Sequence, residues 1–156
     1  ATAVSESDYL LKQKIETWKV AAKHALELGK PAKYDFFRTC APLNFSSEFL
    51  ESNPDFLHER AEMVSNLPDD WFIAFSRLCE CFQSLDITEQ LCDITVPTLI
   101  IAAEYDDLKT VRYSSILSSK IPGSESVIVM NAGHSIVIEN SAEFLTCLMG
   151  FISKQV

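Results

Sequence analysis

Asp106 and His134 are the residues of this sequence best suited to acid–base chemistry. Asp106 lies in the acidic turn 104–107 after the apolar run 97–103, with Asp107 beside it as the alternative acid. His134 follows a second apolar run, 126–130. A histidine can take a proton from a hydroxyl group and return it to a leaving group. A carboxylate can fix the tautomer of that histidine and stabilise its imidazolium form. The two residues therefore predict the acid and the base of a Ser-His-Asp triad.

The nucleophile of such a triad is not found. The glycines are only four and no two lie close together, which excludes a G-x-S-x-G nucleophile turn and the glycine-rich loops that cradle phosphates. The oxyanion donors that accompany the turn are missing with it. We therefore predict that this chain alone hydrolyses nothing measurable. A G-x-S-x-G encoded about 50 to 100 residues upstream of Ala1 would identify the class of the protein, whereas a start codon there would favour a non-catalytic module.

Two predicted strands must position the acid and the histidine. Residues 97–103 and 126–130 are short, continuous aliphatic runs, typical of parallel strands covered on both faces, and residues 111–120 between them predict a helix. The carboxyl ends of adjacent parallel strands meet at one edge of a sheet, so we expect Asp106 and His134 to approach each other there. A last helix should begin near Asn140, with Glu143 as its capping-box partner. We expect this helix to bury Phe144, Leu148 and Phe151.

The first 85 residues predict helices only. Apolar residues recur every three or four positions in 7–28, which predicts a first helix. A second helix over 32–40 should end before Pro42. Asn53-Pro54 should open a third helix, which ends near residue 65. Pro68 precedes a fourth helix. The buried residues that we expect on the first and fourth helices are Leu11, Ile15, Trp18, Ala22 and Ala25, and Trp71, Phe75, Leu78 and Phe82.

These patterns divide the chain into two regions. We interpret residues 1–85 as a helical cap or lid, and residues 86–156 as an α/β core segment that carries the acid and the histidine. A sheet of two parallel strands leaves an apolar edge open on each strand. We therefore expect either an N-terminal half outside this sequence or a second copy of the chain to complete the sheet.

Composition limits the partners. The chain has 156 residues, 47% of them hydrophobic, and a net charge of −9, which argues against nucleic acid or an anionic membrane as a partner. No apolar run is long enough to span a membrane and the N-terminus is no signal peptide, so we expect a cytoplasmic protein. The five cysteines lack a metal-binding spacing and read as free thiols, so no metal and no cofactor is expected.

The C-terminal motifs resemble the α/β hydrolases, specifically the C-terminal portion of that fold. The resemblance covers residues 86–156 and rests on the order of their motifs. The helical stretch that includes 44–49 looks like the caps of members that hydrolyse esters and lactones. The motifs are 91–94 leading into 96–101, then 104–106, then 121–123, and then Gly133-His134 with Glu139 after them.

The resemblance implies roles for particular residues. It places the run 97–103 as the seventh of eight strands, followed by the acid at Asp106, and it places His134 after the eighth. The sequence departs from the family at Ala103, where glycine is usual, and at Thr110, where proline is common. Glu139 is expected to order the loop or the last helix rather than to act in catalysis.

The implied parent protein is a serine hydrolase that acts on a small-molecule ester, thioester or lactone through an acyl-enzyme, without a cofactor. Four residues close to predicted loops are candidate walls of the substrate pocket: Phe36, Phe37, Phe45 and Ile136. The alternative is a non-catalytic interaction module, or an oligomer, that uses the cap and the open sheet edge.

Overall fold

The computed structural model describes residues 3–155, which form two compact units. The helical unit comprises residues 7–42 and 47–85, and the α/β unit comprises residues 3–6, 43–46 and 86–155. Two short segments of the first 85 residues thus belong with the later part of the chain. The division into a cap and a core after residue 85 stays a prediction.

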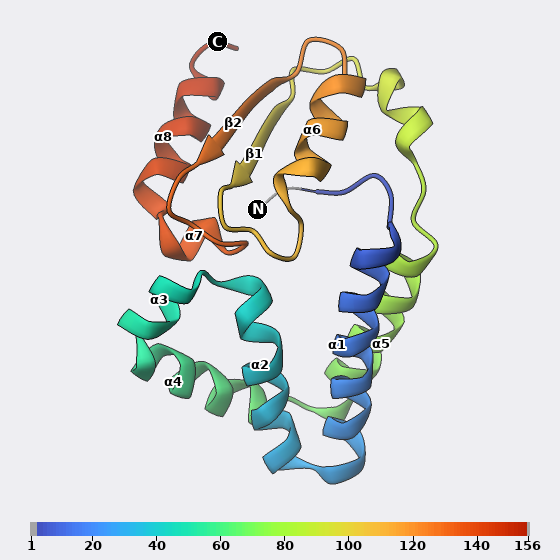
Figure 1. Cartoon of the computed structure of the whole chain (residues 1–156), viewed down its shortest axis with the longest axis vertical. Coiled ribbons are helices and arrows are strands. Elements are labelled where there is room, and N and C mark those ends of the chain that lie inside the picture. Colours follow the sequence, from blue (N-terminus) through green and yellow to red (C-terminus); the bar gives the residue numbers. More distant parts are fainter. Residues whose placement is uncertain (1–2, 156) are drawn as a thin grey trace. The chain divides into compact units, whose positions relative to one another are not determined.

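The helical unit is built from five helices. They are α1 (Tyr9–Leu28), α2 (Lys30–Asn44, whose last two residues belong to the α/β unit), α3 (Ser47–Ser52), α4 (Pro54–Ser65) and α5 (Asp69–Gln83). Helix α1 lies along α5 (Figure 1). All five residues expected to form the buried stripe of α1 are buried, which confirms that prediction.

Two predictions about the helical unit are wrong in detail. Helix α2 does not end before Pro42 but continues through it to Asn44. A proline in the last turn removes only one intrahelical hydrogen bond, so the helix tolerates it there. On α5, Trp71 and Leu78 are exposed, whereas Phe72 and Cys79 are buried. Large apolar side chains occupy two neighbouring stripes of α5, and the spacing in the sequence does not indicate which of the two stripes is buried.

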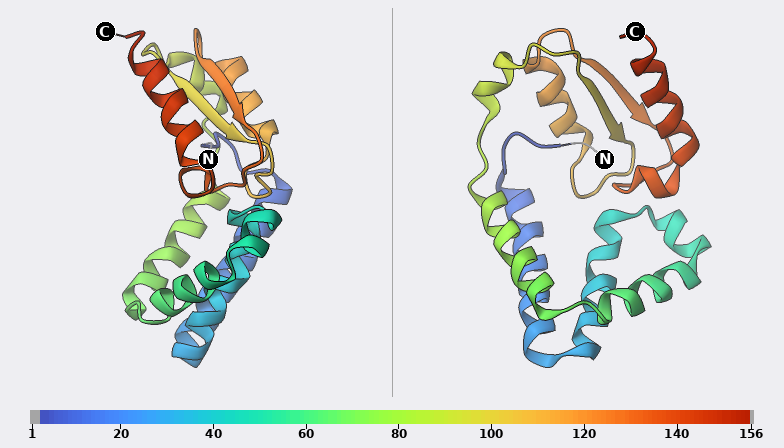
Figure 2. Two further views of the ribbon diagram at one scale, coloured as in Figure 1. Left: turned by 90° about the vertical axis from the view of Figure 1, so that its left-hand side faces the viewer. Right: turned by 180° about the vertical axis from the view of Figure 1, so that it is seen from behind.

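The α/β unit has three layers. Strand β1 (Leu99–Ala103) pairs in parallel with β2 (Glu125–Val129), with Leu99 opposite Glu125 and Ala103 opposite Val129. Helix α6 (Val111–Lys120) covers one face of this sheet and α8 (Ser141–Ile152) lies on the other (Figure 2). The helix predicted over 111–120 is confirmed, and β1 begins two residues later than expected.

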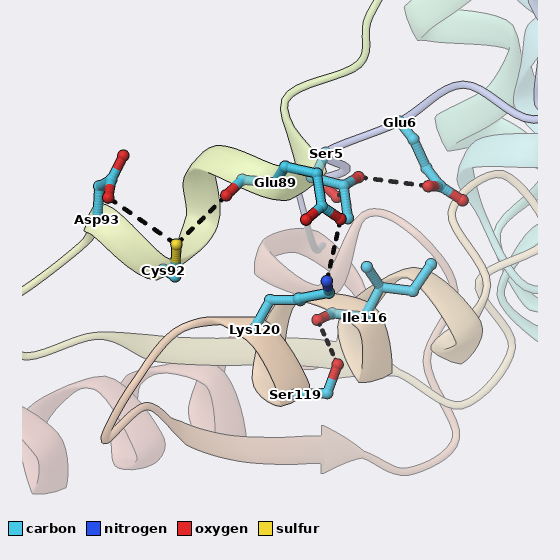
Figure 3. A network of polar contacts seen from close by, with 9 residues as sticks. Ser5, Glu6, Glu89, Cys92, Asp93, Ile116, Ser119 and Lys120 are labelled. Atoms are coloured by element: carbon cyan, nitrogen blue, oxygen red, sulfur yellow. Dashed lines mark hydrogen bonds and ion pairs between the residues drawn. The ribbon is translucent and has the colours of Figure 1, made fainter.

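Two shorter helices complete the α/β unit. The 3-10 helix η1 (Thr88–Asp93) precedes β1, and α7 (Ile136–Glu139) precedes α8. Figure 3 shows Lys120 of α6 reaching Glu89 of η1, with 3.0 Å between Nζ and Oε1. The thiol of Cys92 donates to the carbonyl of Glu89. The predicted start of α8 at Asn140 is confirmed, because the Asn140 side chain caps the helix. The capping box is incomplete: the Glu143 carboxylate accepts from the Asn140 side-chain amide (2.9 Å), whereas the Asn140 backbone N–H donates to the Ile136 carbonyl.

The apolar core of the α/β unit lies mainly between the sheet and α6. Leu91, Ile100, Leu117 and Ile121 form one buried cluster there. A second cluster of small and aliphatic residues, which contains Ala103, Val129, Ala132 and Ile136, lies where the strands end. Helix α8 buries no residue completely, so the expectation for Phe144, Leu148 and Phe151 is too strong: each is half-buried.

The described residues 3–155 contain neither a membrane-spanning helix nor a cluster of metal-binding side chains. No helix there is long and apolar enough to cross a membrane. Within the same residues, no three side chains of the metal-binding types gather into a group that could hold an ion.

Candidate active site

The acid loop joins β1 to α6 and buries Asp106. The Asp106 Oδ1 accepts hydrogen bonds from the backbone N–H groups of Leu108 (3.0 Å) and Lys109 (2.6 Å). An aspartate that accepts from the backbone two and three residues ahead stabilises its own turn. One carboxylate oxygen therefore fixes the loop, and Oδ2 remains for another donor. Asp107, the neighbouring candidate acid, is exposed.

His134 lies on the loop that follows β2. Its Nδ1 is 2.8 Å from Asp106 Oδ2, so the expected approach of the two side chains is confirmed. An ionised carboxylate can only accept, so Nδ1–H is the donor of this pair, and in the neutral ring Nε2 then carries the lone pair. The Asp106 side chain is fully buried, whereas 19% of the His134 side chain is exposed. This arrangement presents Nε2 as a base while the opposite ring nitrogen is held.

Several hydrogen bonds hold the backbone around His134. We call residues 131–135 the histidine loop; it begins at Asn131, whose φ of 52° is in the left-handed region. Carboxylates hold two of its amides, and backbone groups hold two further positions. The bonds run from Asn131 N–H to Glu104 Oε2 (3.0 Å), Tyr105 N–H to Ala132 O (2.9 Å), Gly133 N–H to Glu139 Oε2 (3.0 Å) and Ser135 N–H to Asn44 O (2.8 Å).

Burial changes the acid–base behaviour of a few groups. It lowers the pKa of Lys109, and the negative charge of Asp106 opposes this shift. In the helical unit, burial raises the pKa of the Cys40 thiol to about 12 and that of Cys79 to about 11. None of the five cysteines forms a disulfide bond, and these two buried thiols are unsuited to act as nucleophiles at neutral pH.

The four candidate pocket residues lie in different surroundings. Ile136 is completely buried in the second core cluster, beside the histidine loop, and Phe45 is buried in the same α/β unit. Phe36 packs edge-on against Phe72 at 5.3 Å in the helical unit, and Phe37 is half-buried there. The role of these residues in binding a substrate stays a prediction.

Sequence reasoning did not find the positions of Glu104 and Ser46. Glu104 was part of an acidic turn, and only the fold shows that its carboxylate reaches Asn131. Ser46 lies 93 positions before Glu139, yet its hydroxyl donates to that carboxylate at 2.6 Å. Hydrogen bonds between such distant segments leave no signal in local spacing. Glu139 does contact the histidine loop, in line with the expectation that it orders this region.

Curated relatives match parts of the chain. No family model matches the sequence. A proline iminopeptidase from Saccharolobus solfataricus is 39% identical over 69 residues, which are 44% of this chain and 22% of that protein. The 3-oxoadipate enol-lactonase 1 from Acinetobacter baylyi is 24% identical over 110 residues, 70% of this chain and 40% of that protein. The chain thus spans less than half the length of these two relatives.

Solved structures match nearly all of the chain. An alpha/beta hydrolase enzyme from a Medee basin deep-sea metagenome library has a TM-score of 0.85 and 24% identity, over 97% of this chain and 54% of that one. The enol-lactonase from Burkholderia xenovorans has a TM-score of 0.73 and 22% identity, over 88% and 50% of the two chains. A thermophilic esterase from Thermogutta terrifontis has a TM-score of 0.74 and 14% identity, over 96% and 53%. The architecture of this chain is therefore about half of the fold that these proteins share.

Proposed function

We propose that this chain, which has the fold of the C-terminal portion of the α/β hydrolases, supplies the acid and the base of a serine hydrolase. The substrate is an ester, thioester or lactone, and the reaction passes through an acyl-enzyme. One observation carries this proposal: Asp106 Oδ2 lies 2.8 Å from His134 Nδ1 at the edge of the sheet where both strands end. A buried carboxylate behind a partly exposed imidazole is the arrangement that a general base requires.

The proposed reaction gives the two nitrogens of His134 separate roles. A serine hydroxyl attacks the substrate carbonyl while Nε2 takes its proton, and the same nitrogen then protonates the departing alcohol or thiol. Water repeats the sequence on the acyl-enzyme and releases the acid. Throughout, Asp106 accepts a hydrogen bond from Nδ1–H. It stabilises the imidazolium that forms when Nε2 carries the proton taken from serine or water.

The partner that we propose is the N-terminal half of the hydrolase core, which brings the serine and more strands. An apolar hollow of about 440 Å³ is lined by the consecutive residues 98–101 and by Leu117 and Phe144. Consecutive strand residues point to opposite faces, so a hollow lined by all of them lies along the free edge of β1. A further strand at that edge would pair with β1 and fill the hollow.

The ester and lactone class rests on the extent of one match. The enol-lactonase relative aligns over 110 residues, more than either 1–85 or 86–156 contains, so the match includes both regions. The match to the proline iminopeptidase has 39% identity but covers only 44% of the chain. Because cleavage of an ester and of an amide uses the same acid and base, a short match carries less information about the substrate.

Sequencing the DNA upstream of Ala1 tests where the nucleophile comes from. We expect an open reading frame with a G-x-S-x-G motif. The longer polypeptide should hydrolyse p-nitrophenyl acetate, and His134→Ala should lower kcat by about three to six powers of ten. The 156-residue chain should show no turnover above buffer. A start codon directly before Ala1, or turnover by the chain alone that His134→Ala abolishes, would contradict the proposal.

A second copy of the chain is the competing occupant of the open edge. Size-exclusion chromatography with light scattering distinguishes the two. If the edge serves the N-terminal half, the isolated chain should form a concentration-dependent mixture with exposed apolar surface, and the longer polypeptide should be monodisperse. A stable dimer of the 156-residue chain that binds no hydrophobic dye would instead favour the interaction module.

A further inference from the structure

Glu139 holds two distant segments of the α/β unit on one carboxylate oxygen. Its Oε2 accepts hydrogen bonds from the Gly133 N–H (3.0 Å), the Ser46 N–H (3.1 Å) and the Ser46 hydroxyl (2.6 Å). Three donors therefore converge on a single oxygen. The other oxygen, Oε1, is buried and has no hydrogen-bond partner among the described residues.

The two segments meet at backbone contact because residue 133 is glycine. A Cβ atom at Gly133 would lie 2.5 Å from the backbone nitrogen of Ser46 and 2.8 Å from the carbonyl carbon of Phe45. No side chain fits into that space. The histidine loop thus packs directly against the segment 43–46, and the Ser135 N–H donates to the carbonyl of Asn44 (2.8 Å).

These contacts hold the backbone on both sides of His134. On the N-terminal side Gly133 is held by Glu139, and on the C-terminal side Ser135 is held by Asn44. The imidazole orientation depends on the backbone between these points. Without the bond at Gly133, the restraints nearest to His134 on its N-terminal side would be those at Ala132 and Asn131.

We propose that Glu139 is a positioning residue for His134, which it orients by fixing the backbone of Gly133. The carboxylate does not act on a substrate. It keeps the ring where Nδ1–H reaches Asp106. The contribution of this orientation to catalysis rests on the proposed function, whereas the orientation of the imidazole by Glu139 does not. Ser46 takes part because its two donors hold the Glu139 carboxylate in place.

The test measures the tautomer of His134 in the 156-residue chain labelled with ¹⁵N-histidine. Two-bond ¹⁵N–¹H spectra at about pH 8.5, where histidines of ordinary pKa are neutral, distinguish Nδ1–H from Nε2–H rings. The unchanged protein should show the Nδ1–H form for His134. Glu139→Ala should produce a mixture with the Nε2–H form, and Ser46→Ala should produce a smaller shift in the same direction.

Glu143→Ala is the matched control. It removes a carboxylate from the first turn of α8 without contact to Gly133, so the tautomer should not change even if the urea midpoint falls. Full retention of the Nδ1–H form in Glu139→Ala, or an equal loss in Glu143→Ala, would overturn the proposal. If Glu139→Ala fails to fold by circular dichroism, Ser46→Ala decides by the same spectra, and full retention of the Nδ1–H form in that variant overturns the proposal. None of these measurements needs hydrolase activity. The positioning role of Glu139 and the proposed hydrolase function can therefore fail independently.

Discussion

The two faces of the sheet in the α/β unit differ in how completely they are packed. On the face of α6, the strand residue Ile100 lies in a buried cluster with Leu117 and Ile121. On the face of α8, no helix residue is fully buried, although α8 contains mainly apolar residues. The cluster on the face of α6 is buried, although its residues also line the hollow at the free edge of β1. The face of α8 is only partly covered.

Helix α8 carries two apolar stripes, and only one meets the sheet. Phe144, Leu148 and Phe151 are half-buried, while Leu145, Met149 and Ile152 are 53%, 60% and 44% exposed. A helix that is apolar on more than one side is normally enclosed on more than one side. The difference between the faces therefore supports the proposed partner. The N-terminal half of the hydrolase core would cover the exposed stripe of α8 and would also pair with β1.

The largest effect expected from this comparison is on stability. Ile100→Ala should lower the free energy of unfolding by about 2–5 kcal/mol, because it leaves a cavity in a buried cluster. Leu145→Ala should change it by less than about 0.5 kcal/mol, because the side chain is half exposed. Urea unfolding followed by circular dichroism measures both. Equal losses would show that the α8 face is packed in solution, contrary to the comparison.

Two glycines give the next contrast. Gly133→Ala should destabilise the chain by about 1–3 kcal/mol, because the new Cβ would meet the backbone of Ser46. Gly150 lies within α8, and a Cβ there meets nothing within 4 Å. Gly150→Ala should therefore stabilise the helix by about 0.5–1 kcal/mol. Thermal melts would decide, and destabilisation by Gly150→Ala would mean that α8 has a close neighbour.

The sequence predicted those elements whose signals are local. The stripe of α1, the N-cap of α8 at Asn140 and the helix from Val111 to Lys120 follow from spacing within one element, and the structure confirms them. The approach of Asp106 and His134 followed from a rule about parallel strands, which depends on topology rather than on side-chain detail.

The features that the sequence missed depend on tertiary contact. On α5, Phe72 rather than Trp71 is buried, because both stripes are apolar and packing selects between them. The bond from Ser46 to Glu139 joins residues 93 positions apart, and no local pattern announces it. The half-burial of Phe144 has the same cause: its spacing shows which side of α8 is apolar, but not what covers it.

Alkaline pH should reveal the closed interior of the helical unit. The pKa of Cys40 is raised from 9.0 to about 12 by burial, so the folded state holds this proton more tightly than the unfolded state. The stabilising contribution is complete below pH 9 and is lost as the pH rises toward 12. For this group, stability should fall by about 1 kcal/mol between pH 9 and 10. Urea midpoints at both pH values measure the loss, and Cys40→Ala should reduce it. An unchanged slope in that variant would show that Cys40 is not buried in solution.

The smallest expected change in stability tests the open stripe of α8 most directly. Met149→Lys should alter the free energy of unfolding by less than about 0.5 kcal/mol, because Met149 is 60% exposed. The same change places a charge within the stripe and should lower the fluorescence of a bound hydrophobic dye. Thr146→Lys adds an equal charge at an exposed polar position of α8 and should leave the dye signal unchanged. If both variants lower the signal equally, the dye responds to net charge and not to this stripe. If Met149→Lys strongly destabilises the isolated chain, α8 is already covered in solution, and the proposed site for the rest of the hydrolase core is occupied.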